Sequence, residues 1–489
     1  MQYLDDDVVD LRRDDGTTWQ YYWGDRCEVL SEEGGKKRVQ MIGLKGPVDE
    51  GFISSKTNLR DTGLLRLSMV DVQQGDGLIL DTPAGKVVFI DGGDSKLFAR
   101  HAAARYAGTS AADPLLVDAV IVTHGDADHF DGLSDLIESE KNREKRKRIF
   151  VAPRRVYHNG LAKRPGKIDE VKVAETEMFG AVTDVGGRPF ATELVEAPRT
   201  VPEPQLNKPF KKWVRTLGAW ADRLSAVVGE EMIVRRLDHT IGDAFDFLED
   251  EDVHVELLGP ITEDVDGTPG LAFLRDPPDD ARLMLGLKPG TKPGSWSASH
   301  TINGHSIFMR IRYGNVRFLM TGDMNEESMN RLRAALPNAR LRAEILKTPH
   351  HGSADFNYGF LQEVSPVVSL ISSGDESEQK EYIHPRATLM AALGKASRTT
   401  PGIIFCTELA AFFAMRDYVQ DPKDPTRKFF AFERTNFGIA HIRTDGERVL
   451  AFTHSGKKGF NEAYRFTVSP SGEIEFAPQV SKRSAPKLT

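Results

Sequence analysis

The chain has 489 residues, of which 40% are hydrophobic and 28% are charged, and its formal net charge is −8. This length is sufficient for two or three domains. No apolar run approaches the roughly 18 residues that a membrane-spanning helix needs, and no cationic segment followed by an apolar one opens the chain, so we expect a cytoplasmic protein that does not associate with membranes. Two cysteines, Cys27 and Cys406, exclude a disulfide framework and a cysteine-rich zinc site. The acidic balance argues against broad affinity for nucleic acid, but it says little about local patches.

The N-terminal segment consists of short alternating runs separated by Gly-rich turns. Examples are 19–23, 27–30 and 38–42. This spacing predicts a small β-barrel over residues 1–58. The pattern is similar to a bacterial SH3-like domain, which would offer a site for a protein partner.

From Leu65 onward the sequence alternates between strand-like and helix-like segments, each bounded by Gly, Pro or Asp. The predicted strands are 65–72, 77–80, 86–90, 117–122, 253–258, 306–312, 316–320, 344–348, 438–443 and 448–452. The predicted helices are 97–107, 326–335 and 387–396. This alternation predicts an α/β fold.

A polar, Pro-containing stretch over residues 134–252 interrupts this rhythm. Its pattern is typical of helices, and the apolar positions around Trp213 and Trp220 predict a helix over 210–228. We therefore expect a large helical insertion within a domain that spans 63–455, followed by a C-terminal strand and tail over 456–489.

The densest group of chemistry-bearing residues directly follows the strand predicted at 117–122. His124, Asp126, Asp128 and His129 lie within six positions. A loop that leaves a strand end can direct the first two at one metal ion and the last two at a second. Two neighbouring metals need a shared anionic ligand, which Asp323 at another strand end would supply. A further imidazole is available at Pro349-His-His-Gly-Ser353.

The motif His124-Gly-Asp-Ala-Asp-His129 resembles the HxHxDH motif of the metallo-β-lactamase superfamily. The flanking segments narrow the resemblance to the hydrolase domain of ComEC-type competence proteins, because they occur in the same order. These segments are Asp71–Gly77, Ile90–Gly93, Thr321–Asp323, Lys347–Ser353, His384–Pro385 and Glu433–Ile439. Together they cover about residues 63–133, 253–260 and 300–455. The resemblance implies an αββα sandwich with a dinuclear metal centre at one edge of two packed sheets.

The resemblance also implies a role for each matching position. His124 and Asp126 would hold the first metal, Asp128, His129 and His350 the second, and Asp323 would bridge both. Asp91 would support the metal loop through hydrogen bonds.

Two features of the motif depart from the superfamily pattern. Asp126 stands where most members carry a second histidine, which makes Mn²⁺ or Mg²⁺ plausible beside Zn²⁺. The segment before Asp323 contains His305, which would either complete the first site or be a loop residue.

Several residues outside the motif each allow two interpretations. One of His350 and His351 is expected to be a metal ligand, with His350 favoured, while the other contacts substrate or packs against the site. His384 would act as a proton donor or phosphate contact, or have no catalytic role. The Ser353 hydroxyl would contact substrate or cap a turn.

The charge is unevenly distributed along the chain. Residues 141–167 contain eleven Lys and Arg residues and one acid, Glu144. Such a run beside a metal site could follow a phosphate backbone, with Lys145, Arg146, Lys147 and Arg148 as its core, or it could be a solvated surface. The acidic segment 243–252 would repel nucleic acid and could pair with this run.

These observations predict a hydrolase that uses a hydroxide activated by two divalent metals, Zn²⁺ or Mn²⁺ with Mg²⁺ as a further candidate. DNA is the expected substrate, which makes the protein a nuclease or phosphodiesterase. The alternative is a hydrolase of a small ester, lactone or nucleotide, with the insertion as a lid. A third reading is a non-catalytic adaptor.

Overall fold

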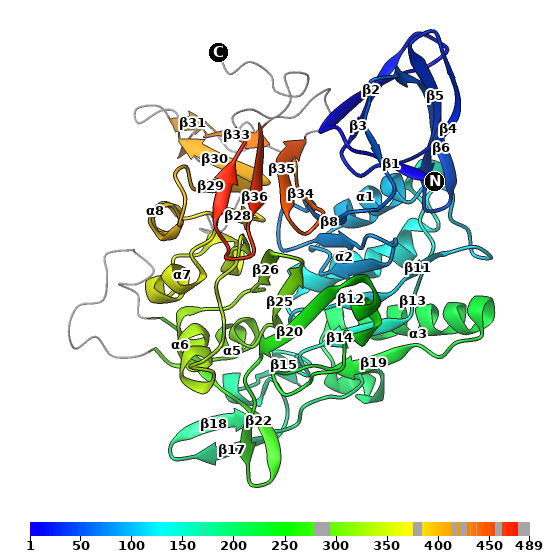
Figure 1. Ribbon diagram of the computed structural model, residues 1–489. Helices are drawn as coiled ribbons and strands as arrows, with labels where there is room; N and C mark the ends of the chain where they lie inside the picture. Colours follow the sequence, from blue (N-terminus) through cyan, green and yellow to red (C-terminus); the bar gives the residue numbers. More distant parts are fainter. Residues whose placement is uncertain are drawn as a thin grey trace.

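The computed structural model describes residues 1–168, 170–277, 294–374, 384–412, 418–420, 428–430, 432–436, 438–454 and 462–477. Within these ranges the protein is a mixed α/β structure built around two large sheets (Figure 1). The predicted α/β class is therefore confirmed. The end of the predicted C-terminal tail, beyond residue 477, lies outside the described residues.

The larger sheet has ten strands, parallel from β19 to β10 and antiparallel from there to β37. Its strands in spatial order are β19 (Ile233–Arg236), β14 (Arg155–His158), β12 (Ala119–Ile121), β10 (Val87–Ile90), β9 (Leu78–Asp81), β8 (Leu65–Met69), β34 (Ile439–Thr444), β35 (Arg448–His454), β36 (Glu462–Val468) and β37 (Ile474–Phe476). Every residue of β9 and β10 is buried, as expected for strands covered on both faces.

The second sheet has six strands, of which the last four are parallel. They are β20 (Val253–Gly259), β25 (Phe308–Tyr313), β26 (Val316–Met320), β27 (Ile345–Lys347), β28 (Val368–Ile371) and β29 (Ile403–Cys406). The sequence predicted most of these segments to within two residues at each end, because each is a short apolar run bounded by polar or turn residues.

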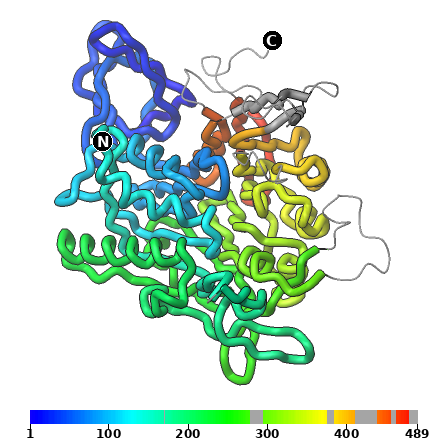
Figure 2. The backbone as a smooth tube through the Cα atoms, turned by 180° about the vertical axis from the view of Figure 1, so that it is seen from behind, coloured from blue at the N-terminus to red at the C-terminus, as the bar shows by residue number. Residues whose placement is uncertain are grey.

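Three hydrophobic clusters show how the layers pack. The first joins the two sheets face to face, with Leu67 and Leu80 from one and Met309 and Phe318 from the other. The second packs the outer face of the ten-stranded sheet against the helices α1 (Leu97–Arg105), α2 (Ala127–Ser139) and α3 (Lys208–Val228). The third packs the outer face of the six-stranded sheet against α6 (Glu326–Ala335), α7 (Tyr358–Val364) and α8 (Ala387–Ala396). Helices thus lie outside both sheets, as the views from the front and from behind show (Figures 1 and 2).

The N-terminal residues form a separate antiparallel sheet of seven strands, which curves at one corner of the molecule (Figure 1). Its strands in spatial order are β3 (Thr18–Tyr22), β2 (Val8–Arg12), β6 (Gly46–Ser54), β5 (Lys36–Gly43), β4 (Arg26–Glu33), β1 (Gln2–Leu4) and β7 (Leu59–Arg60). Trp23 is fully buried where this sheet meets the ten-stranded one, and it packs with Leu450 and Phe452. Its ring lies beneath the guanidinium groups of Arg448 and Arg465, so the two parts are joined by both apolar and charged contacts.

The segment 134–252 is not the helical insertion that the sequence predicts. After the end of α2, the described residues of this segment form one α-helix, α3, which Asn207 caps by accepting a hydrogen bond from the Phe210 N–H. The same segment supplies β14 and β19 to the ten-stranded sheet. It also contains β13 (Val151–Pro153), β15 (Lys167–Ile168), β16 (Val171–Lys172), β17 (Val182–Val185) and β18 (Arg188–Ala191). These strands escaped prediction because they are short and lie among charged residues.

The acidic segment 243–252 does not pair with the basic run. Asp243 pairs with Arg235 at 2.8 Å, and Glu251 pairs with Lys86 at 3.2 Å.

Smaller elements complete the described chain. They are β11 (Leu115–Val117), β21 (Glu263–Val265), β22 (Thr268–Ala272), β23 (Leu274–Arg275), β24 (Trp296–Ser297), β30 (Glu408–Phe412), β31 (Tyr418–Gln420), β32 (Lys428–Phe430), β33 (Phe432–Asn436) and α5 (Ala298–Gly304). Among the helices of the described ranges, none has the length and apolar character needed to cross a membrane.

Candidate metal centre

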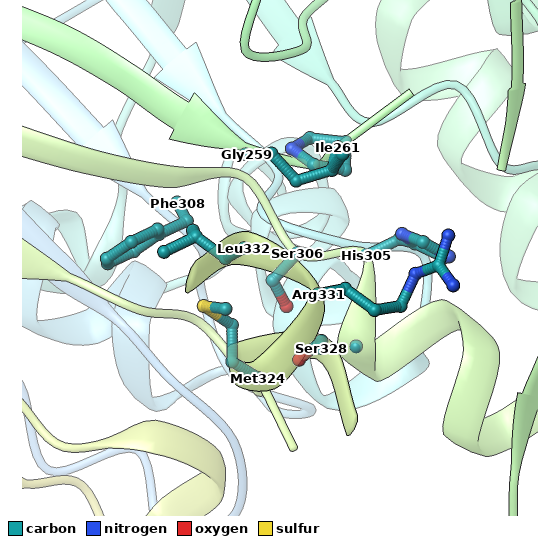
Figure 3. A pocket seen from close by; sticks show the side chains of 11 residues that line it. Gly259, Ile261, His305, Ser306, Phe308, Met324, Ser328, Arg331 and Leu332 are labelled. Atoms are coloured by element: carbon teal, nitrogen blue, oxygen red, sulfur yellow. The ribbon is translucent and has the colours of Figure 1, made fainter. Parts of the chain in front are cut away.

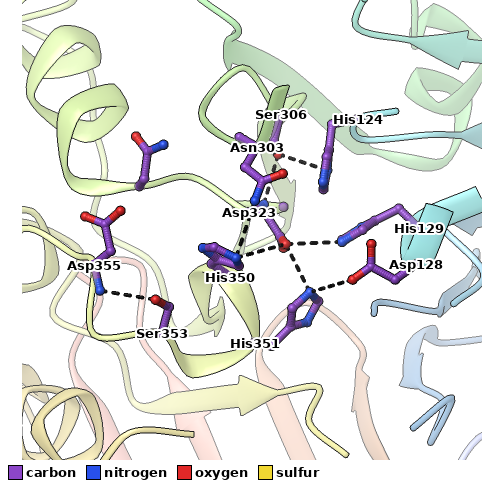
Figure 4. Close-up of polar contacts among 12 residues, drawn as sticks. His124, Asp128, His129, Asn303, Ser306, Asp323, His350, His351, Ser353 and Asp355 are labelled. Atoms are coloured by element: carbon purple, nitrogen blue, oxygen red, sulfur yellow. Dashed lines mark hydrogen bonds and ion pairs between the residues drawn. The ribbon is translucent and has the colours of Figure 1, made fainter. Parts of the chain in front are cut away.

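The candidate ligands meet where strands of both large sheets end. Asp91 follows β10 and His124 comes shortly after β12, while Asp128 and His129 lie in the first turn of α2. From the other sheet, Asp323 follows β26. His350 and His351 lie after β27, in a short 3₁₀ segment, Pro349–Gly352. Residues far apart in the chain therefore converge because the carboxyl ends of these strands face one region (Figure 4).

The described residues include four groups of three side chains that could each hold a metal ion, with ligand atoms within 4.8 Å of one another. These groups are His124, His129 and Asp323; Asp128, His129 and His351; Asp76, Asp323 and His351; and Asp76, Asp91 and His129. Because the groups share members, they form one continuous cluster of imidazoles and carboxylates.

Asp323 lies at the centre of this cluster. Its Oδ2 lies 3.2 Å from His129 Nε2, 3.0 Å from His351 Nε2 and 3.9 Å from His350 Nε2. Within the described part of the chain, neither Nε2 of His129 nor that of His351 completes a hydrogen bond. Buried ring nitrogens that face a carboxylate without a well-aligned hydrogen bond are the donor set that a divalent metal would satisfy.

Two further carboxylates orient the histidines. Asp91 Oδ2 lies 2.8 Å from His129 Nδ1, and Asp76 Oδ1 lies 3.3 Å from His351 Nδ1. Each imidazole therefore has one nitrogen against a supporting carboxylate and the other directed at Asp323. This arrangement fixes the ring orientation in metal sites of proteins. Asp91 also accepts hydrogen bonds from the backbone and hydroxyl of Thr123, at 2.8 and 2.6 Å.

The carboxylates shift the pKa values of the histidines. Burial lowers the pKa of His129, but Asp323 and Asp91 outweigh it and hold the pKa well above its usual range. The same balance, with Asp323 and Asp76, raises the pKa of His351 to about 9. Burial raises the pKa of Asp323, but the surrounding imidazoles hold it well below the usual value. Positive charge thus stabilises this cluster, whether from protons or from metal ions.

Lys347 contributes a fully buried positive charge beneath the cluster. Its ammonium pairs with Asp76, lies 3.6 Å from Asp323 Oδ1 and donates to the Gly322 carbonyl at 2.9 Å. The sequence analysis assigned no role to Lys347 or Asp76. Only their positions could have indicated a role, because both lie in segments that flank the metal motif.

Asn303 is another residue that the sequence analysis missed. With its amide oriented to donate, the nitrogen lies 3.2 Å from His124 Nε2 and 2.9 Å from Asp126 Oδ2. Ser306 supports His124 from the other side, with Oγ 3.3 Å from Nδ1. The side chain of Asn303 therefore lies between His124 and the His350 ring (Figure 4).

The structure brings His351 rather than His350 into the three-residue groups. Both have left-handed backbone conformations, with φ of 47° and 51°, and Gly352 follows with φ of 90°. Two successive non-Gly residues in this region are costly, and such strain occurs most often at functional sites. The turn directs His351 at Asp323 and Asp128, while His350 lies further from both.

Asp126 belongs to none of the three-residue groups. Its Oδ1 pairs with Lys163 Nζ at 2.9 Å. Burial raises the pKa of Asp126, and Lys163 opposes this shift. Asp126 occupies the N-cap position of α2, but its carboxylate makes no capping hydrogen bond. Its partners among the described residues are Lys163 and Asn303.

Of the two alternatives for His305, the structure favours a residue outside the site, because the ring is turned away from the cluster. Its Nε2 lies 2.8 Å from the Ala272 carbonyl, and its ring lines a small pocket beside Arg331 (Figure 3). Burial lowers the pKa of His305 to about 4, so this ring is a neutral core residue.

The remaining predicted residues lie at the margin. The His384 ring lies 6.0 Å from the His350 ring, and burial lowers the pKa of His384 to about 3. Ser353 Oγ accepts a hydrogen bond from the Asp355 backbone at 3.2 Å, which is the turn-capping role.

The basic group 145–148 lies at the far end of α2 from the cluster. The helix has 13 residues, and a rise of about 1.5 Å per residue separates its ends by about 20 Å. Arg146 and Lys147 both pair with Glu144, so part of their charge is neutralised locally.

The comparisons with known proteins are remote. No family model matches the sequence, and a search of curated proteins finds no match. Among solved structures, the crystal structure of a long form RNase Z from yeast aligns with 8% identity and a TM-score of 0.26. The alignment covers 85% of this chain and 50% of that one, so the chain corresponds to about half of that structure. A likeness at this level carries no argument about fold or activity.

Proposed function

We propose that this protein is a metal-dependent hydrolase with a metallo-β-lactamase fold and that it cleaves phosphodiester bonds in DNA. The observation that carries the proposal is the Asp323 carboxylate, on which the Nε2 atoms of two carboxylate-supported histidines converge. The packing of two sheets between outer helices, with the site at the strand ends, supports the same assignment.

The donor set fits two divalent ions. His124, His129 and Asp323 would hold one. His351 Nε2 lies 3.9 Å from Asp128 Oδ2 and 3.0 Å from Asp323 Oδ2, so these three residues would hold the other. The mixture of imidazole and carboxylate suits Zn²⁺ or Mn²⁺. When bound, such ions lower the pKa of water and stabilise negative charge that develops on a reacting phosphate.

The protein's own groups have distinct tasks in this proposal. Asp91 and Asp76 orient His129 and His351, and Lys347 offsets the negative charge of Asp76 and Asp323. Asp128 is the most exposed of the central carboxylates, with 23% of its side chain accessible, and therefore faces the substrate side.

Two groups of basic residues support DNA as the substrate. Lys163 lies at the cluster, and the 145–148 group lies about 20 Å away, a distance that about six base pairs of DNA would span. A substrate that contacts both positions must therefore be several base pairs long.

The test is cleavage of single- and double-stranded DNA by the purified protein with Mn²⁺, Mg²⁺ or Zn²⁺. We expect metal-dependent cleavage that the Asp128→Ala/His129→Ala variant loses and that an Asp184→Ala variant, altered at an exposed position in β17, retains. Absence of cleavage of either DNA form, with metal-dependent hydrolysis of a small ester or lactone, would instead establish the alternative substrate class.

A second measurement addresses the basic group. Charge reversal at Lys145, Arg146, Lys147 and Arg148 should reduce the dependence of DNA affinity on salt concentration, because fewer counterions are released. An unchanged salt dependence removes this group from the substrate path.

A further inference from the structure

A cavity of about 170 Å³ lies between the N-terminal sheet and the ten-stranded sheet. Four arginines from four different elements line it: Arg26, Arg66, Arg105 and Arg443. Met41, Ile42, Leu44 and Val48 form an apolar wall of the same cavity. By volume the cavity has room for about five water molecules, which is also sufficient for a phosphate group.

The arginines are only partly neutralised. Asp25 is the single acidic residue in the lining, and it lies 2.9 Å from Arg443 and 3.4 Å from Arg66. The buried Asp81 pairs with Arg105 and lies 3.8 Å from Arg66. Two carboxylates thus face four guanidinium groups, which leaves the cavity with net positive charge.

Two of the guanidinium groups have unused hydrogen-bonding capacity. Arg443 is 6% exposed, and among the described residues its Nε has no hydrogen-bond partner. Arg26 donates to the Ala84 carbonyl at a long 3.3 Å. A buried guanidinium without full hydrogen bonding is unfavourable, and an oxyanion is the ligand that satisfies it best.

The electrostatics of the neighbourhood agree with this geometry. Burial lowers the pKa of Arg443, and the charges of Arg66 and Arg105 lower it further against the effect of Asp25. Burial and the charges of Arg443 and Arg105 also hold the pKa of His441 well below its usual range. Positive groups in this region therefore destabilise one another.

From these contacts we infer that the cavity binds a phosphate group, either as free phosphate or as part of a small molecule whose organic body packs on the apolar wall. This site is separate from the candidate metal centre. In β10, Val87 lies beside Asp81 and the cavity, whereas Ile90 leads into Asp91 and the metal centre. Four residues of extended strand, about 13 Å, separate the two ends. The inference does not depend on the proposed function.

The test is titration of the full-length, metal-free protein with inorganic phosphate and, separately, with adenosine monophosphate at constant ionic strength. The affinity is measured by calorimetry and the midpoint of thermal unfolding is measured in parallel, with sodium chloride as the reference anion for both. We expect binding and a higher midpoint with at least one phosphate-bearing probe. Binding of both probes indicates a site for the free ion, and binding of adenosine monophosphate alone indicates a site that also needs the organic body.

Variants at the rim distinguish this cavity from other sites. Arg26→Gln and Arg66→Gln should each weaken binding about tenfold, because each removes one charge-assisted contact. Arg312→Gln, at an exposed position in β25, should leave it unchanged, and the Asp128→Ala/His129→Ala variant should bind as the wild type does. The inference is overturned if neither probe exceeds chloride, if the rim variants bind equally well, or if the metal-centre variant loses binding. Circular dichroism establishes that each variant is folded.

Discussion

The two ends of strand β10 lead to buried charge clusters of opposite character. At one end, four carboxylates and four imidazoles surround Asp323, with Lys347 and Lys163 as the counter-charges. At the other, four arginines surround a cavity with two carboxylates. The first cluster is stabilised by cations and the second by anions. The same sheet therefore supports both sites. Its hydrogen-bonded strands hold the like charges of each cluster close together despite their mutual repulsion.

The first prediction removes the centre of the acidic cluster. Asp323→Asn keeps the size of the side chain but removes the charge that His129, His351 and Lys347 share. We expect metal-dependent hydrolysis to fall by at least about 10³-fold, measured as kcat/KM on a cleaved substrate. Asp184→Asn, at an exposed position in β17, is the matched control. An active Asp323→Asn variant would show that the reaction occurs elsewhere.

The second prediction concerns the buried cation of the same cluster. Lys347→Met leaves Asp76 and Asp323 without their shared ammonium, and we expect the free energy of unfolding to fall by about 3–5 kcal/mol in chelator. Urea unfolding measures this loss. Saturating Mn²⁺ or Zn²⁺ should reduce the difference from the wild type, because the uncompensated negative charge of the variant binds a cation more tightly and binding stabilises the folded state by mass action.

Two outcomes would contradict this account of Lys347. A loss no larger than that of Lys36→Met, at an exposed position in β5, would show that the buried ammonium contributes little. If metal does not change the difference in the free energy of unfolding between variant and wild type, Lys347 is not coupled to the metal centre.

The third prediction compares two adjacent histidines. His351 faces Asp323 at 3.0 Å and His350 at 3.9 Å, so His351→Ala should weaken metal binding by at least about 100-fold and His350→Ala by less than about tenfold. Competition with a chelating dye measures both affinities. The reverse order would restore His350 as the ligand, which was the choice favoured from sequence.

The contrast between the two clusters also explains what sequence could predict. His124, Asp128 and His129 are close in the chain, so a local motif indicates their chemistry, and Asp323 follows a recognisable strand. The choice between His350 and His351 depends on two left-handed backbone conformations that the residue types do not indicate. The supporting contact of Asp76 with His351 arises only when two sheets pack together.

The arginine cavity had no sequence signal at all. Arg26, Arg66, Arg105 and Arg443 lie in β4, β8, α1 and β34, and each resembles an ordinary surface arginine in its own segment. Strands of the ten-stranded sheet were predicted well where they are apolar runs, such as β10. Strands β14 and β19 were missed because Arg155, Arg235 and Arg236 obscure their pattern.

The last prediction concerns His101, a buried histidine on the helix that carries Arg105 of the cavity. The His101 ring on α1 has a buried Nε2 without a hydrogen-bond partner in the described structure, and burial with Arg105 lowers its pKa to about 3. The unfolded chain binds a proton near pH 6.5, so stability is fully present above that pH and is lost as the pH falls toward 3. Between pH 7 and pH 5 this loss is about 1–2 kcal/mol. His101→Gln should remove it, whereas His254→Gln, at a more exposed position in β20, should not. Urea unfolding at the two pH values measures the difference, and an equal loss in wild type and His101→Gln would show that His101 does not cause this pH dependence.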